Sequence, residues 1–598
     1  MTLIMRKLFL LSLVVILLLA VACTPVTVTN EFSEAEPGEE SSPAAAQSTE
    51  SATPESTVES NPSSGSTQSS APASSVPLAP PAASVPSTSA APAPSVGARG
   101  GVLRRLWADP PTLDPHLTSD TTSATIVVEV YSGLITIGID LRLAPDIAEK
   151  WDISDDGTVY TFHIRPEAKF HNGKSITAAD FVYSINRAAS PRTASPTADT
   201  YLGDIVGVRD VLDGIADTVS GVQAIDEKTL KITIDAPKAY FLAKLTYPTA
   251  FVLDQSQVES DPSWLDAPNG SGPFKLKEYK IGERIILERF DEFYLEPAML
   301  DQINMNLAGG QAMAMYENDE IDITGVGLFD LERLKDPNEP MSKELKVSPP
   351  GFSVTYIGLN PNEAPFDDLK FRQALNYAID KDVIANEVYS GRLVPAHGIL
   401  PPGFPGYNPN LVGLRFDPEL AKQLLAESSY ADPDSRPRIT ITVPGTGGTI
   451  GLDLEVIQEM WIQNLGVEVE IQQVEWATYL QDLNRRKFQA FAGLSWQADY
   501  PDPQDFLDIL FHSESETNHG GYSNSEVDAL LEAARVEIDV SKRVKLYNDA
   551  EKMIVEDAAW VPLWYTGDRF LLLKPYIKGY ALTPMTLPKL RHVYIEGK

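Results

Sequence analysis

Cysteine is almost absent from this chain, because Cys23 is the only one in 598 residues. A single thiol cannot form a disulfide within the chain, so the folded part must be held together by its core. Histidine is scarce too, and none of the seven histidines has the i, i+4 spacing of a helical metal site. Lys and Arg number 48 against 83 Asp and Glu, which gives a formal net charge of −35. This balance argues against nucleic acid as a partner, because phosphates are bound by basic patches.

Long apolar runs are also lacking, and the one present lies at the N-terminus. It covers residues 8–21 and follows Arg6 and Lys7, but a membrane-spanning helix needs ~20 apolar residues. A basic start, a short apolar run and small residues at its end are typical of an export signal. The sequence LAVAC at residues 19–23 resembles a bacterial lipobox, with Ala20 where leucine is usual. We expect a lipoprotein signal peptide over residues 1–22 and lipidation of Cys23; a plain secretory signal is the alternative.

Residues 23–98 contain few aromatic or large aliphatic side chains and are rich in Ser, Pro, Ala and Thr. Such a composition cannot bury enough apolar surface to offset chain entropy. We expect a disordered, semi-extended tether here. About 500 residues follow the tether, which is enough for two or three domains.

The rest of the chain mixes strand and helix patterns without strict alternation. Residues 158–164 alternate as a strand after an Asp-Gly turn. Thr177 and Asp180 are spaced as a capping box before a helix. Residues 371–388 predict one long amphipathic helix. The pattern indicates a large α/β chain of several lobes.

Motifs for catalysis are missing. The chain has neither a G-x-S-x-G elbow nor an H-E-x-x-H helix. Gly173, Lys174 and Ser175 resemble the end of a phosphate-binding loop, but Ala168 stands where its first glycine belongs. Carboxylates are abundant, and an acid/base pair among them cannot be picked out by sequence. We expect no enzyme, no cofactor and no metal; an exported hydrolase is the alternative from another class.

Several short motifs are spread over the chain from about residue 101 onward. They are PTLDPH at 111–116, APDIAEKW at 144–151, TFHIR at 161–165, NGKSITAADFVYS at 172–184, NGSGPF at 269–274, RQAL at 372–375, WQADYPDP at 496–503 and VPLWY at 561–565. Together they resemble bacterial extracellular solute-binding proteins of family 5, the oligopeptide- and dipeptide-binding lipoproteins of ABC importers.

This resemblance implies an α/β, periplasmic-binding-protein-like two-lobe hinge fold (class II, cluster C type) with an additional inserted domain. Lobe I is expected to comprise residues 99–131, 246–352 and 562–598, the inserted domain residues 132–245, and lobe II residues 353–561. The two lobes would close on a ligand about chain crossings near residues 356–360 and 559–563.

The resemblance also implies a ligand site between the lobes. Asp499 would pair with the α-ammonium of a peptide, and a turn role is the alternative. Ser495, Trp496 and Gln497 would hydrogen-bond the peptide backbone as an added strand. The further residues implied are Ser119 on the opposing segment, Trp476, Trp564 and Tyr565 as walls of side-chain pockets, and Arg485 in place of an arginine that some relatives carry just before the aspartate. The tryptophans could instead be core residues, and Arg485 a solvated helix end.

The function implied is that of a substrate-binding receptor of an ABC importer. It would capture oligopeptides and deliver them to permease subunits in the membrane. It would act as a monomer, exported and lipid-anchored through Cys23 at the cell surface or the periplasmic side of the cytoplasmic membrane. The same fold binding an oligosaccharide or a metal chelate is the alternative within the family.

Overall fold

The computed structural model describes residues 100–445, 450–585 and 590–598, so the predicted signal peptide, Cys23 and the predicted tether lie outside the described residues. In this part of the chain the larger sheets have seven, six and four strands. No helix of the described residues is both long and apolar enough to cross a membrane.

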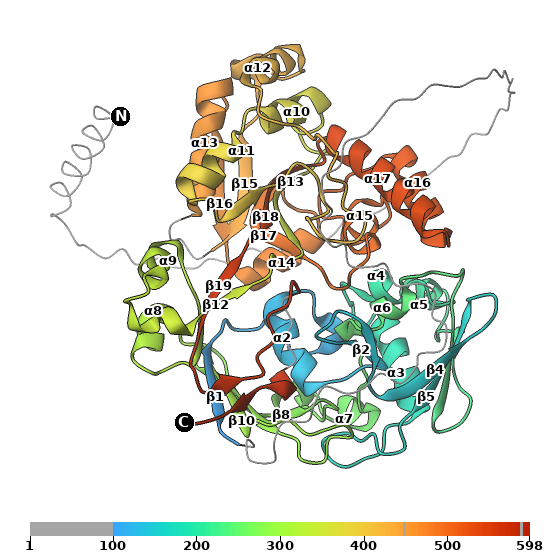
Figure 1. Cartoon of the computed structure of the whole chain (residues 1–598). Coiled ribbons are helices and arrows are strands. Elements are labelled where there is room, and N and C mark those ends of the chain that lie inside the picture. Colours follow the sequence, from blue (N-terminus) through green and yellow to red (C-terminus); the bar gives the residue numbers. More distant parts are fainter. Residues whose placement is uncertain (1–99, 446–449, 586–589) are drawn as a thin grey trace, which may run out of the picture. The chain divides into compact units, whose positions relative to one another are not determined.

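The seven-stranded sheet is assembled from segments that lie far apart in the sequence. Its strands, in spatial order, are β12 (Leu345–Ser348), β19 (Arg569–Leu573), β11 (Ile323–Gly325), β1 (Val102–Leu106), β10 (Gln302–Asn306), β9 (Arg284–Arg289) and β8 (Phe274–Lys280). Figure 1 shows the blue β1 beside green strands and the red β19 close by. Leu103, Leu287 and Ile303 are fully buried and form a core with helix α2 (Thr121–Val130).

The six-stranded sheet has the order β14 (Leu393–Pro395), β18 (Trp560–Thr566), β13 (Ser353–Leu359), β17 (Ala490–Gln497), β15 (Ile439–Pro444) and β16 (Val469–Val474). The chain passes between the two large sheets twice, from β12 to β13 and from β18 to β19. Because Tyr565 still pairs with Val354, the second passage begins after Thr566, beyond the residue 562 at which the resemblance places the boundary.

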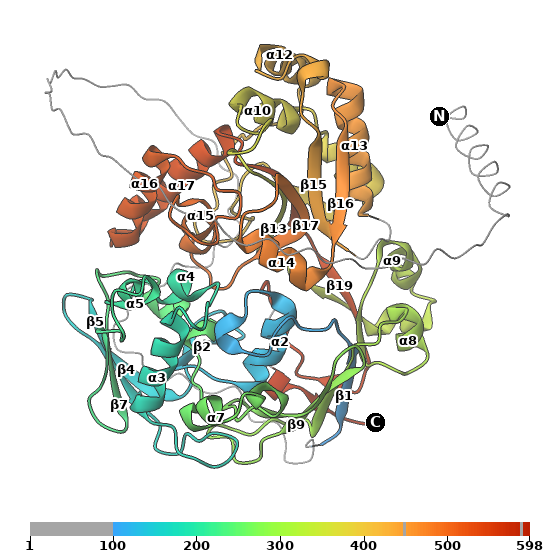
Figure 2. The ribbon, with the colours of Figure 1, turned by 180° about the vertical axis from the view of Figure 1, so that it is seen from behind.

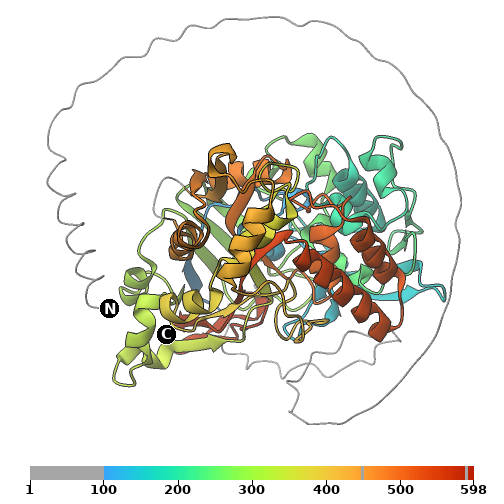
Figure 3. The same ribbon diagram turned by 90° about the horizontal axis from the view of Figure 1, so that it is seen from above.

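Helices flank the six-stranded sheet in two groups, each with its own core. The first group contains α10 (Leu369–Tyr377), α12 (Pro418–Glu427) and α13 (Leu452–Leu465), which are seen beside β15 and β16 from behind (Figure 2). The second contains α14 (Trp476–Asn484), α15 (Gln504–Phe511), α16 (Ser525–Val536) and α17 (Val540–Glu556). The view from above shows the red helices α16 and α17 packed side by side (Figure 3).

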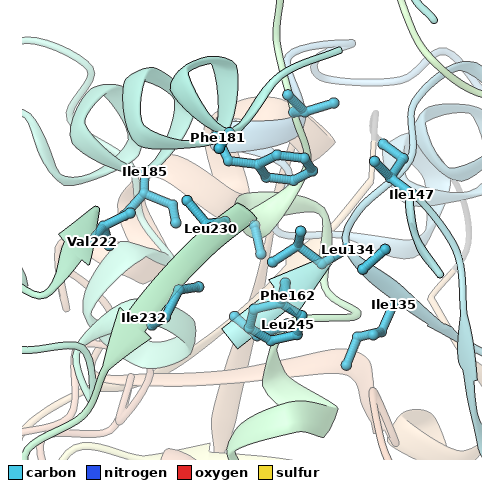
Figure 4. Close-up of a cluster of buried hydrophobic side chains, with 14 of the residues drawn as sticks. Leu134, Ile135, Ile147, Phe162, Phe181, Ile185, Val222, Leu230, Ile232 and Leu245 are labelled. Atoms are coloured by element: carbon cyan, nitrogen blue, oxygen red, sulfur yellow. The ribbon is translucent and has the colours of Figure 1, made fainter. Parts of the chain in front are cut away.

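The third region is built on the four-stranded sheet β4 (Ala148–Ile153), β5 (Val159–Ile164), β7 (Thr229–Thr233) and β6 (Val222–Ala224). Phe162 and Leu230 of this sheet pack on Phe181 of helix α3 (Ala178–Ala189) in a core shown in Figure 4. The strand predicted over residues 158–164 is confirmed as β5. The capping box is confirmed as well, because the backbone N–H and the hydroxyl of Thr177 donate to Asp180 at 2.9 and 2.7 Å.

Shorter elements complete the described part. They are α4 (Ala198–Leu202), α5 (Val208–Leu212), α6 (Phe241–Lys244), α7 (Gln255–Ser260), α8 (Ala312–Glu317), α9 (Leu328–Lys335), β2 (Ile135–Ile137), β3 (Leu143–Pro145), β20 (Ile577–Lys578) and β21 (Tyr594–Ile595).

The single helix predicted over residues 371–388 is wrong. α10 ends at Tyr377, and the chain restarts as α11 (Lys381–Val383) followed by a π-helical turn (Ile384–Val388). The carboxylate of Asp380 accepts the Val383 N–H at 3.0 Å and so caps a new helix start. The carbonyl oxygen of Tyr377 accepts a hydrogen bond from the Asp417 N–H instead of continuing the helix. The local capping bonds therefore override the hydrophobic periodicity.

Candidate functional site

Asp499 lies in the loop between β17 and α15, where three segments of the chain meet. Its carboxylate accepts a hydrogen bond from the hydroxyl of Tyr201 on α4. The Tyr201 ring stacks on Tyr247, with centroids 3.6 Å apart and planes 2° from parallel. The Tyr247 hydroxyl donates to the carbonyl oxygen of Thr118 at 3.3 Å, directly before Ser119. These contacts bring Asp499 and Ser119, which are far apart in sequence, into one neighbourhood.

No basic side chain of the described residues forms an ion pair with Asp499, which is half-buried. Burial raises the pKa of this carboxyl to about 7, and the hydrogen bond from Tyr201 opposes the shift. At neutral pH the group therefore lies near the midpoint of its titration. A cation placed beside it would favour the ionised form.

Asp505 is a second carboxyl without a cation, and it supports the loop that contains Asp499. It is completely buried on α15, and its Oδ2 accepts the backbone N–H of Asp499 at 3.0 Å. Burial raises the pKa of Asp505 well above its ordinary value, and the charge of Asp499 adds to the shift. The protonated acid keeps its carbonyl oxygen as an acceptor for the Asp499 N–H, so the loop is held without a second buried charge.

Two further aspartates of the same segment are paired with arginine. Both oxygens of Asp502 accept from Arg543 on α17, at 2.6 and 2.8 Å. Asp508 is bound likewise by Arg535 on α16, at 2.7 and 2.8 Å. Burial alone would raise the pKa of Asp508, but the bonds from Arg535 outweigh it and the pKa is lowered. The segment is thus fixed to the helices behind it through its paired aspartates.

The strand that leads to Asp499 has an unpaired edge. β17 pairs with β13 along most of its length, from Ala490 to Gln497, but with β15 only at Ala490 and Phe491. The two strands part around Gly493, whose φ of 78° favours glycine. Residues 494–497 therefore have a strand on one side only among the described residues. Such an edge presents backbone N–H and C=O groups to an added strand.

The side chains of this edge point in different directions. Ser495 is exposed, and its hydroxyl is 2.5 Å from that of Thr355. Trp496 is half-buried against the core of the second helix group. The Gln497 amide donates to the carbonyl oxygens of Phe352 and Pro584, at 3.3 and 3.2 Å.

Other predicted residues differ in how far they fit the site. Trp476 begins α14, is half-buried, and stacks on Tyr479 with centroids 5.9 Å apart. Arg485 ends that helix, is exposed, and donates to Gln481 at 3.3 Å, which matches a solvated helix end.

Trp564 and Tyr565 are buried core residues, contrary to our expectation that they form walls of side-chain pockets. They are 3% and 4% exposed. The Trp564 indole donates to Asp453 at 3.1 Å, and the Tyr565 hydroxyl accepts the Gly398 N–H at 3.1 Å. They lie on β18 between β13 and β14, where both faces of the strand are covered.

Sequence reasoning did not find Tyr201, Tyr247 or Asp505. A tyrosine on a short helix is expected to be a core residue, and Tyr201 is indeed only 2% exposed. A signal for Asp505 was present, because aspartate recurs at every third position from 499 to 508. Within residues 100–445, 450–585 and 590–598, no group of three or more His, Cys, Asp or Glu side chains could hold a metal ion.

Comparisons with known proteins agree with this arrangement. The profile of the bacterial extracellular solute-binding proteins, family 5 (middle), matches residues 142–518. The chain is 31% identical to the periplasmic oligopeptide-binding protein OppA of Escherichia coli over 510 residues, 83% of this chain and 92% of that protein. It is also 31% identical to heme-binding protein A of Haemophilus influenzae over 480 residues, 76% of this chain and 85% of that protein.

Solved structures show the same fold. The complex of Haemophilus influenzae OppA with the peptide RPPGFSPFR superposes with a TM-score of 0.74 at 26% identity. The superposition covers 83% of this chain and 98% of that chain. The predicted two-lobe α/β fold is confirmed by this likeness.

Proposed function

The chain belongs to the bacterial extracellular solute-binding proteins of family 5, and we propose that it captures oligopeptides between two lobes and delivers them to an ABC importer. The lobes in this proposal are the regions around the seven-stranded and six-stranded sheets. The four-stranded region, residues 132–245, is the inserted domain. The strand passages from β12 to β13 and from β18 to β19 act as hinges.

The observation that carries the proposal is the unpaired carboxylate of Asp499 beside the open edge of β17. A peptide of any sequence offers a backbone and an α-ammonium group. Residues 494–497 supply partners for the backbone, and Asp499 supplies the counter-charge for the ammonium. Charge neutralisation within a closed cleft favours the ionised form of Asp499. Recognition of these constant features leaves the side chains of the peptide free to vary.

Binding requires the inserted domain to separate from the lobe of the six-stranded sheet, because Tyr201 of the inserted domain covers Asp499 in the present arrangement. A second contact between the same regions joins the hydroxyls of Thr200 and Thr517 at 3.0 Å. Both bonds are compatible with a hinge motion, since neither is part of a continuous strand or helix. The cycle is opening, capture and closure, with no covalent step.

Anchoring and delivery are further parts of the proposal. Lipidation of Cys23 holds the receptor beside its permease subunits, and the segment 23–98 connects the lipid to the lobes. The relatives are named as periplasmic proteins, which supports an exported location. A Cys23→Ser variant is expected in the soluble fraction; its retention in the membrane fraction contradicts the anchor but not the binding role.

The test is recovery of bound ligand. Purified protein is incubated with a library of short peptides, and the retained molecules are identified by mass spectrometry. Intact peptides with free N-termini are expected. Cleaved products would instead support a hydrolase, and retention of heme or sugar but no peptide by a folded preparation would contradict the peptide assignment.

A further inference from the structure

Arg105 carries a guanidinium group with buried N–H donors that have no hydrogen-bond partner. It lies near the end of β1, and its Cζ sits 4.0 Å from the centroid of the Trp107 ring. Its Nε and Nη1 are buried, yet neither has a hydrogen-bond partner. The side chain as a whole remains partly exposed. The group is therefore held in place by the indole while its donors stay unused and solvent can still reach it.

An unpaired buried guanidinium is costly. Arginine stays protonated in proteins and carries five N–H donors, and a buried charge without hydrogen bonds is strongly disfavoured. Burial lowers the pKa of Arg105. Native structures rarely leave such donors unsatisfied, and an exception calls for a ligand or a comparable partner.

A second arginine lies in the same sheet. Arg569 begins β19, and its Nε is also buried without a partner, although its Nη2 donates to Ser348 at 3.1 Å. Tyr580 interacts electrostatically with both guanidinium groups. The carboxylate of Glu129 acts on Arg105 too, but its Oε1 already accepts the Leu590 N–H at 2.8 Å.

The position of the two arginines fits a ligand site. β1 and β11 run parallel, and Arg105 pairs with Ile323 near the carboxyl end of β1. Open α/β sheets bind ligands beyond the carboxyl ends of parallel strands. Arg569 also donates to the carbonyl oxygen of Thr583, and the next residue, Pro584, accepts from Gln497 at 3.2 Å. Arg569 is thus linked through residues 583 and 584 to the last residue of β17, two residues before Asp499.

We propose that Arg105, supported by Arg569, receives a carboxylate of the bound peptide. The inference rests on the proposed function and deepens it, because it assigns a receptor to the second kind of charge a peptide carries. A planar guanidinium matches a carboxylate with two parallel hydrogen bonds. The stacked Trp107 fixes the plane of the fork, since its own Nε1 donates to the Thr122 carbonyl oxygen at 3.1 Å. The carboxylate is the C-terminus of a short peptide or the side chain of an acidic residue.

The test compares four probes on the full chain: trialanine, its C-terminal amide, N-acetyl-trialanine, and Ala-Glu-Ala amide. Wild type is expected to bind trialanine at least about tenfold more tightly than the amide. Arg105→Met should remove that preference, because it should weaken the binding of trialanine and leave the binding of its amide unchanged. Arg105→Lys should keep part of it, because it preserves the charge but not the fork. Arg192→Met, at an exposed arginine of the inserted domain, is the matched control and should bind all four probes like wild type.

The fourth probe identifies the source of the carboxylate. If Ala-Glu-Ala amide binds more tightly than trialanine amide only when Arg105 is present, Arg105 receives an acidic side chain. If instead only the affinity for the C-terminal acid depends on Arg105, the residue receives the C-terminus. Equal weakening of acid and amide by Arg105→Met, or no gain in wild-type affinity from either the C-terminal acid or the glutamate side chain, overturns the inference. Discrimination against N-acetyl-trialanine would persist in that case and leave the proposed function intact.

Loss of fold is checked separately. Because the guanidinium also acts on the buried Glu129, thermal unfolding of Arg105→Met and Arg105→Lys is compared with that of wild type, and binding is scored at a temperature where all three are folded.

Discussion

The four aspartates at positions 499, 502, 505 and 508 form two pairs with opposite environments. Asp502 and Asp508 are each held by an arginine from the helices behind them. Asp499 and Asp505 have no cation in the described part of the chain, and burial raises the pKa of both. Within one short segment the same side chain therefore has two uses. The aspartates paired with arginine fix the segment to the helices behind it, Asp505 holds the loop from the core, and Asp499 is the one that we assign to a ligand.

The largest effect should come from breaking a paired aspartate. Arg543→Met leaves Asp502 buried and uncompensated, and should lower the free energy of unfolding by about 3–5 kcal/mol. Chemical denaturation followed by circular dichroism measures the change. Arg485→Met, at an exposed helix end, should stay within about 0.5 kcal/mol of wild type. A loss below about 1 kcal/mol for Arg543→Met would remove the structural role given to the pair.

The unpaired aspartates should instead make binding depend on pH. The groups facing Asp499 are the hydroxyl of Tyr201, the ring of Tyr247 and the carboxyl of Asp505, and the pKa of Asp499 is about 7. A peptide ammonium requires the ionised form, so affinity should fall towards about tenfold per pH unit below pH 7. Calorimetry from pH 5.5 to 7.5 should show this together with proton release on binding; a flat profile contradicts it.

The stability of the ligand-free protein should have the opposite trend. The raised pKa of Asp499 means that the folded state binds more protons than the unfolded state between about pH 4 and pH 7. Its contribution is therefore fully present below the unfolded pKa and lost as pH rises through about 7. Thermal unfolding of Asp499→Asn should lack this component of the pH dependence.

A smaller effect is expected from Asp505→Asn. The amide mimics the protonated acid and can still accept the Asp499 N–H through its carbonyl oxygen. Stability should change by less than about 1 kcal/mol, and the midpoint of the affinity profile should stay where it is in wild type, because the acid that is replaced carries no charge near pH 7. Asp502→Asn is the matched control and should lose much more stability, since Arg543 is left unpaired. Equal losses in the two variants would erase the distinction between the pairs.

The smallest effect should come from Tyr201→Phe. The hydroxyl stabilises the ionised form of Asp499, and the ring stack on Tyr247 does not need it. Loss of one such bond should weaken peptide binding near pH 7 by about two- to tenfold and move the midpoint to higher pH, whereas Asp505→Asn should leave the midpoint in place. A shift of the Tyr201→Phe midpoint to lower pH would contradict the assigned hydrogen bond.

The sequence predicted what is encoded locally. The alternation over residues 158–164 and the Thr177–Asp180 box act within a few residues, and both are present in the fold. The WQADYPDP motif at residues 496–503 predicted that Asp499 lies in a loop after a strand. The break after Tyr377 was missed because a hydrophobic period cannot report a competing cap at Asp380.

Residues that act through distant contacts could not be predicted. Tyr201 meets Asp499 across 298 positions in the chain. The sequence does not distinguish the adjacent Arg104 and Arg105. The fold pairs Arg104 with Asp322 and leaves Nε and Nη1 of Arg105 without a hydrogen-bond partner. Trp564 and Tyr565 gave the reverse error, because an aromatic run on a strand does not show whether both of its faces are covered.

The central claim is that Asp499 binds the α-ammonium of a peptide. The most direct measurement is the affinity of wild type and Asp499→Asn for one peptide with a free N-terminus and for its N-acetylated form. We predict that the substitution weakens binding of the free-amine peptide by at least about 30-fold and binding of the acetylated peptide by less than about threefold. Equal weakening of both peptides would contradict the claim.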